Sequence, residues 1–226
     1  MASMGDRLEE MPLFPLNTVL FPYAQLQLHV FEDRYRDLVQ YCTRKDQPFG
    51  VVLIRSGEEV GGHAEPYMVG TAVRIVSVHT FDDGKMDVRV QGERRFRVRR
   101  LDESRPYMVG WVEPLIEMEI EDMDKAEGLV MTSRDYVQAY IESYFAKFDV
   151  KVAQIKLPND PTAHSFVVAN FLQIENLEKQ RLLETTDTVE RLSDIIPILE
   201  QHMVEAKAPT HHKVTRQHME EWISPN

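Results

Sequence analysis

The chain has 226 residues, 43% of them hydrophobic and 28% charged, a balance that supports one large or two small packed domains and argues against global disorder. Its net charge of −11 disfavours binding to nucleic acids and anionic membranes, unless a local basic patch exists. One cysteine excludes an internal disulfide, and the lack of both a secretory signal and an apolar run of roughly 20 residues indicates a soluble cytoplasmic protein.

The N-terminal half opens with strand signals and one helix. Three prolines in residues 11–22 exclude a helix there, and residues 25–30 alternate polar and apolar side chains as a half-buried strand does. Apolar residues then recur at helical spacing through residues 32–43, which predicts one helix among the strands. These apolar residues are Phe31, Tyr35, Leu38, Val39 and Cys42.

Further strands follow this helix. Residues 49–54 and 70–81 are typical of strands, and a glycine-containing loop separates them. Residues 82–85 (Asp-Asp-Gly-Lys) predict a tight hairpin, because glycine readily takes a positive φ. The basic strand after the hairpin and residues 107–116 complete the set. Several short strands joined by hairpins indicate a small barrel or folded sheet.

The second half, after an acidic run at residues 117–124, is rich in helix formers. Apolar spacings of three and four predict a long helix over residues 122–148. Asp160 followed by Pro161 predicts the start of a second helix. Asn176 and Asp187 are expected to cap two more, the last of them kinked at Pro197.

Strands followed by helices indicate an α+β chain. We predict a β-rich unit over residues 1–117, a helical bundle over residues 118–205 and a polar tail over residues 206–226.

Six segments, in this order, resemble the N-terminal substrate-binding domain of Lon proteases, and the resemblance extends from about residue 11 to 205. It implies a β-rich, PUA-like pseudo-barrel with one inserted helix, followed by a C-terminal helical bundle. It also implies binding of exposed hydrophobic or unfolded protein segments, as an adaptor or in quality control. The matching segments are residues 11–22, 30–39, 70–76 with Asp83-Gly84, 90–97, 159–161 and 178–192.

Lon proteases continue into an ATPase domain and a serine–lysine peptidase domain. The sequence lacks the phosphate-binding G-x-x-x-x-G-K-[ST] loop, since Gly84-Lys85 is followed by Met86, and it lacks a nucleophile motif. We therefore expect a non-enzymatic module without a cofactor. Its expected partners are unfolded or partly folded polypeptides, and a separate full-length ATP-dependent protease is a further candidate.

Two groups of residues are candidates for binding. Phe21, Pro22 and Tyr23 form an apolar segment that prolines keep away from regular strand pairing, so these residues could contact a peptide or could belong to the core. Val19 and Leu20 are expected in the core.

The basic strand from Arg94 to Arg100 supports an alternative function, RNA or nucleotide binding through Arg95, Arg97 and Arg99, as in some PUA-like proteins. Pairing of these arginines with nearby carboxylates, such as Glu93, Asp102 and Glu103, is the simpler interpretation.

No metal site is expected. His211, His212 and His218 lie in a polar tail that offers no fixed geometry. Cys42 lies on the apolar face of the predicted helix and is expected to be an inert core thiol.

Overall fold

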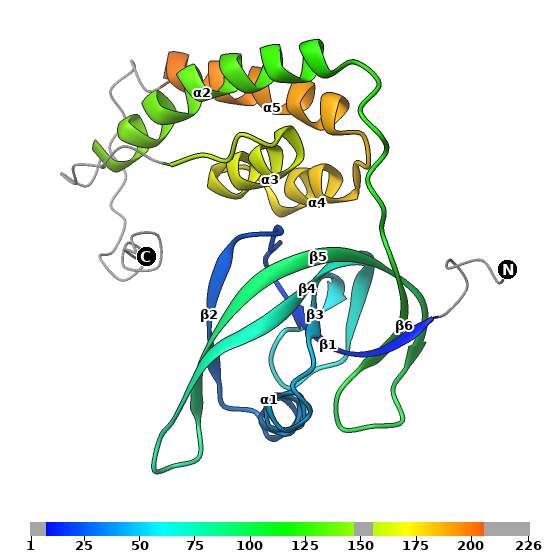
Figure 1. Cartoon of the computed structure of the whole chain (residues 1–226). Coiled ribbons are helices and arrows are strands. Elements are labelled where there is room, and N and C mark those ends of the chain that lie inside the picture. Colours follow the sequence, from blue (N-terminus) through cyan, green and yellow to red (C-terminus); the bar gives the residue numbers. More distant parts are fainter. Residues whose placement is uncertain (1–7, 147–155, 206–226) are drawn as a thin grey trace, which may run out of the picture. The chain divides into compact units, whose positions relative to one another are not determined.

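The computed structural model describes residues 8–146 and 156–205 (Figure 1). The chain divides into two compact units: Met1–Glu117 with Ile174–Thr186, and Met118–Gln173 with Asp187–Asn226. Helices α1 (Asp33–Lys45) and α4 (Asn176–Glu184) belong to the first unit together with the strands. Helices α2 (Met123–Ala146), α3 (Pro161–Phe171) and α5 (Thr188–Glu205) belong to the second.

The first unit is a mixed, six-stranded sheet that curls into a nearly closed ring (Figure 1). Its strands are β1 (Glu9–Leu16), β2 (Gln25–Val30), β3 (Phe49–Gly57), β4 (Ala64–Thr80), β5 (Met86–Asp102) and β6 (Val109–Pro114). The order is β2-β5-β4-β3-β1-β6, and an additional β5–β6 pairing closes the ring. Only β1 and β3 run parallel; the other pairings are antiparallel.

The length of β5 explains this closure. Its first part, residues 86–91, pairs with β2, and its last part, residues 96–102, pairs with β6. One strand therefore contributes both to the ring and to the extension that carries β2. The predicted hairpin before β5 is confirmed: Gly84 has a φ of 82°, and the Phe81 amide donates to the Lys85 carbonyl at 2.9 Å.

Alternating side chains fill the ring. Met86, Val88 and Val90 point into the main core as predicted, and α1 covers this core with four buried residues, Tyr35, Leu38, Val39 and Cys42. The Phe14 and Tyr35 rings stack with centroids 4.0 Å apart. The prediction placed Phe31 on the apolar face of α1, which is wrong, because Phe31 precedes the helix and is 44% exposed.

The second unit packs α2, α3 and α5 against one another. Two predicted caps are confirmed: Asp160 accepts from the Ala163 amide at 2.7 Å, and Asp187 accepts from the Val189 amide at 2.8 Å. Asn176 was expected to cap α4, but it is the first helical residue, and its side chain donates to the Asn17 carbonyl at 2.6 Å. The predicted end of α2 near residue 148 and the tail beyond residue 205 lie outside the described residues.

The predicted fold class is therefore confirmed: an α+β chain with a nearly closed β-ring, one inserted helix and C-terminal helices that pack together. None of the described helices combines the length and the apolar character that a membrane crossing requires.

Candidate functional site

The predicted peptide-contacting segment forms a tight turn before β2. The Ala24 amide donates to the Phe21 carbonyl at 3.3 Å, Pro22 takes the second position, and Tyr23 takes the third with a φ of 69°. This is the pattern of a type II turn, whose third position normally requires glycine or asparagine. Phe21 is fully buried and Pro22 is buried, whereas Tyr23 is 51% exposed. Val19 and Leu20 lie in the core, as predicted.

Two hydrogen bonds join the same turn to β5. The Tyr23 amide donates to the Gly92 carbonyl at 2.8 Å, and the Gly92 amide donates to the Ala24 carbonyl at 2.9 Å. Two residues of one strand thus face one residue of the other, with the first in a left-handed conformation, which defines a β-bulge. Gly92 has no room for a side chain, because a Cβ would lie 2.4 Å from the Phe21 carbonyl oxygen. The turn therefore fixes the backbone at the exposed Tyr23, at a cost in backbone strain.

An apolar groove of about 310 Å³ runs along β2 in the first unit. Its volume is at the lower end of the range for ligand sites. The strand contributes Leu26, Leu28 and Val30, and the opposite wall contributes Leu16 and Val60. The alternation in residues 25–30 predicts the half-buried strand β2. The groove itself is not visible in this local pattern, since the opposite wall comes from β1 and from the β3–β4 loop.

Exposed apolar side chains surround the groove. Phe31 is 44% exposed and Val60 is 54% exposed, and both line the groove. Beside them, the centroid of the His29 ring lies 6.1 Å from that of Phe31 and 6.3 Å from that of Phe81. Phe81 is 39% exposed. Apolar surface of this kind at a groove is typical of a site that binds another molecule.

The β3–β4 loop that carries Val60 is held in place by hydrogen bonds to the segment after β1 and to the start of α1. The Gly61 amide donates to Glu32 Oε2 at 3.1 Å, and Arg34 Nη1 donates to the Gly62 carbonyl at 3.0 Å. Glu59 Oε2 accepts from the Asn17 amide at 2.9 Å. The wall is therefore preorganised, and a ligand would not have to order it.

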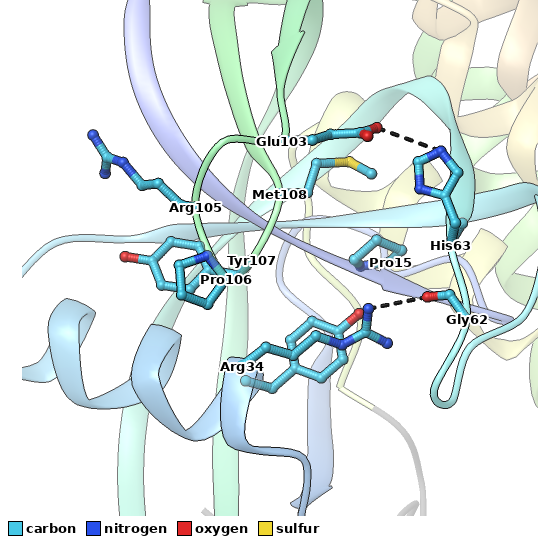
Figure 2. Close-up of a pocket in the computed structure, with 11 residues that line it drawn as sticks. Pro15, Arg34, Gly62, His63, Glu103, Arg105, Pro106, Tyr107 and Met108 are labelled. Atoms are coloured by element: carbon cyan, nitrogen blue, oxygen red, sulfur yellow. Dashed lines mark hydrogen bonds and ion pairs between the residues drawn. The ribbon is translucent and has the colours of Figure 1, made fainter.

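A second, polar pocket of about 230 Å³ lies beyond this loop. Figure 2 shows that His63 and Glu103 face each other at this pocket. Their Nε2 and Oε1 atoms lie 3.6 Å apart. Arg105, which also lines the pocket, pairs with Glu10 at 2.6 Å, and Arg34 pairs with Glu32 at 3.0 Å. Burial raises the pKa of Tyr107, which also lines the pocket, so this phenol stays neutral. Because its cations already face carboxylates, the pocket offers little to an anionic ligand.

Several arginines of the basic strand β5 pair with groups inside the fold. Arg95 is buried and donates to the carbonyls of Leu183 and Thr185 and to the Glu117 carboxylate. Arg99 pairs with Glu113 at 2.6 Å, and this hydrogen bond, with Arg97 contributing nearby, lowers the pKa of Glu113.

Two further arginines of this strand also have partners within the fold. Arg94 pairs with Glu9 at 2.7 Å, and Arg100 lies over the Trp111 ring at 4.8 Å. The prediction that these arginines pair with carboxylates is confirmed, but not with the expected partners Glu93, Asp102 and Glu103. The carboxylates belong to β1, to β6 and to the segment after β6. Phe96 and Val98, which alternate with Arg95, Arg97 and Arg99, are buried in one apolar cluster as predicted, and the register shift between Val98 and Arg100 interrupts the alternation only beyond Arg99.

A serine and a histidine meet in the second unit without forming a reactive site. Ser133 Oγ lies 2.5 Å from His164 Nε2, and His164 Nδ1 lies 3.3 Å from the Pro158 carbonyl. Both side chains are completely buried, so no substrate reaches them. Burial lowers the pKa of His164 to about 4, which leaves the imidazole neutral at ordinary pH.

The remaining candidate groups fit a structural role. Cys42 is buried as predicted, and burial raises the pKa of its thiol to about 12. The thiol therefore stays protonated and unreactive. Across the part of the chain that the structure describes, no cluster of histidine, cysteine or acidic residues could hold a metal ion. His211, His212 and His218 lie outside that part.

The sequence match decides the family. Residues 10–201 match the substrate-binding domain of the ATP-dependent protease La (LON). The chain belongs to this Lon substrate-binding domain family. A Lon N-terminal domain protein from Xanthomonas campestris is similar in structure, with a TM-score of 0.58 and 30% identity over 84% of this chain and 98% of that chain. The N-terminal domain of the Mycobacterium avium complex Lon protease has a TM-score of 0.64 over 86% of this chain and 100% of that one, but only 18% identity, and supports the fold alone.

The curated relatives of this Lon-type domain are longer proteins. The Lon protease of Anaeromyxobacter dehalogenans (strain 2CP-C) is 27% identical over 84% of this chain. The Lon protease of Parabacteroides distasonis is 28% identical over 97% of the chain. The chain spans about a quarter of these relatives, 23% of the first and 28% of the second, so the shared part is the substrate-binding domain and not the whole protease.

Proposed function

We propose that the chain is a non-catalytic module that binds exposed hydrophobic or unfolded polypeptide segments, and that the groove along β2 is where it binds them. The observation that carries this proposal is an apolar groove with a preorganised wall and two exposed apolar side chains, Phe31 and Val60. Apolar surface of a client chain leaves water when it enters such a groove, which is worth roughly 25 cal/mol per Å² buried.

Membership of the Lon substrate-binding family supports the same class of partner, polypeptides. In this proposal the protein acts in the cytoplasm as an adaptor or in quality control, and it either works alone or delivers clients to a full-length ATP-dependent protease. Arginine pairing on β5 gives no support to RNA binding.

The direct test is fluorescence anisotropy of a labelled, permanently unfolded protein titrated with the full chain at low and at moderate salt. Saturable binding that persists at moderate salt is expected, because apolar contacts are insensitive to screening. Val60→Glu should weaken binding about tenfold, since it removes roughly 1.5 kcal/mol of apolar contact. Val76→Glu is the matched control, because Val76 is an exposed valine on β4 that does not line this groove.

Tyr23 provides a second, independent test of the predicted segment. Tyr23→Gly removes the exposed ring and relieves the positive φ, so it deletes a side chain without straining the turn. Weaker binding would add Tyr23 to the site, and unchanged binding would confine the site to the groove. Equal affinities for wild type, Val60→Glu and Val76→Glu would contradict the assignment of the groove, and absence of binding would contradict the function.

A further inference from the structure

The groove of the proposed function is bordered by a strand with an open edge. In the order β2-β5-β4-β3-β1-β6, β2 is the terminal strand and pairs with β5, whereas the ring closes through β5 and β6. Among the described residues, no strand pairs with the second edge of β2. Figure 1 shows β2, in blue, at the margin of the β-rich unit beside β5.

The register identifies the backbone groups at this edge. The Gly92 amide donates to the Ala24 carbonyl, so Ala24 and Gly92 form a hydrogen-bonded pair, and the pairing continues with Leu26 opposite Val90. Hydrogen-bonded and non-hydrogen-bonded residue pairs alternate along an antiparallel ladder. The backbone groups of Leu26, Leu28 and Val30 therefore face β5. Those of Gln25, Gln27 and His29 face the open edge.

Side chains and backbone of β2 thus offer two kinds of contact to one ligand. Leu26 and Leu28 line the apolar groove, while Gln25, Gln27 and His29 are exposed and their amides and carbonyls face away from β5. We propose that the groove binds an extended polypeptide segment as an added strand on the open edge of β2, with apolar residues of that segment at alternate positions. This inference rests on the proposed function and specifies how the client is bound.

Strand addition accounts for recognition of varied clients. Backbone hydrogen bonds supply affinity whatever the sequence, and alternate side chains that reach the groove supply a preference for apolar residues. The carboxylates of Glu32 and Glu59 line the same groove, with Arg34 as the neighbouring cation on Glu32. The resulting negative balance favours segments with basic flanks over acidic ones.

The test uses a short labelled peptide that alternates valine and threonine and carries a lysine at each end. Alternation fixes the register, because only one face of the added strand is apolar. Two derivatives carry backbone N-methyl groups, one at the valines and one at the threonines. Only one set of amides faces β2, so anisotropy should show about a tenfold loss of affinity for one derivative and little change for the other.

A change in the protein provides the complementary measurement. Gln27→Pro removes an amide at the open edge of an edge strand, where proline is tolerated, whereas Gln27→Ala keeps the amide and removes only the side chain. We expect the proline variant to lose peptide affinity and the alanine variant to retain it, with both showing the circular dichroism spectrum of the wild type.

The outcomes separate this inference from the function on which it rests. If both methylated peptides bind as tightly as the parent peptide, strand addition is overturned while polypeptide binding stands. If the unfolded protein binds but the alternating peptide does not, strand addition is likewise overturned. If neither binds, the proposed function fails and this inference fails with it.

Discussion

At the scale of single residues, the position of a charge in the fold determines its role more than its place in the sequence does. Arg95 and Arg99 lie on the same basic strand, yet Arg95 is 3% exposed and satisfies two carbonyls and one carboxylate, whereas Arg99 forms a solvent-exposed ion pair with Glu113. A buried donor that satisfies several acceptors cannot be removed without leaving them unpaired.

Arg95→Met should therefore destabilise the protein by about 3 kcal/mol, since the substitution keeps volume but leaves Glu117 and the Leu183 and Thr185 carbonyls without this donor. Arg99→Met, the matched control on the same strand, should have a far smaller effect because exposed ion pairs contribute little. Urea unfolding followed by circular dichroism measures both. Similar losses for the two variants would contradict this assignment of roles.

His164 gives the protein a defined pH dependence. Burial lowers its pKa in the folded state to about 4, below the 6.5 of the free side chain, so the unfolded chain takes up the proton first. The neutral imidazole thus contributes stability that is present above about pH 6.5 and is lost as the pH falls toward 4, at roughly 1 kcal/mol per pH unit.

The measurement for His164 is the free energy of unfolding of wild type and variants from pH 7 to pH 4.5. His164→Asn is expected to reduce the slope by this amount, whatever its effect on stability at pH 7. His79→Asn, which changes an exposed histidine, should keep the slope of the wild type. If His164→Asn retained the full slope, another group would be responsible for the pH dependence.

At the scale of elements, local patterns predicted most of the helices and strands but not their partners. Asp160 with Pro161 and Asp187 carry their cap signals in the sequence, and both helices start there. Asn176 carries the same signal, but its side chain is used for a contact with Asn17, 159 residues away, which no local pattern reveals.

The candidate site was predictable only in part for the same reason. The alternation in residues 25–30 predicts a half-buried strand, but whether a strand lies at an edge depends on the order of strands. Closure of the ring through β5 and β6 leaves β2 at the edge, and this follows from the length of β5 and from long-range pairing. The conformation of Tyr23 could not be predicted either, because a positive φ at a tyrosine is imposed by tertiary structure and has no signal in the sequence.

At the scale of the whole molecule, the net charge and the ion pairs of the arginines together favour polypeptide binding over RNA binding. A phosphate-binding surface needs basic side chains that remain available, and its affinity would fall by about a thousandfold or more between 50 and 200 mM salt if it made six or more phosphate contacts. Here the chain carries a net charge of −11, and three arginines of β5, Arg94, Arg99 and Arg95, pair with Glu9, Glu113 and Glu117 respectively.

We therefore expect no saturable binding of a labelled single-stranded RNA, even at low salt where electrostatic attraction is strongest. The informative comparison is between wild type and the double variant Arg97→Glu with Arg99→Glu, which leaves the buried Arg95 in place. Anisotropy of RNA should be the same for both proteins, and binding of the unfolded protein should also be unchanged. Saturable RNA binding that falls steeply with salt and disappears in the double variant would instead establish β5 as a nucleic-acid surface, and a client groove along β2 would then have to be a separate site.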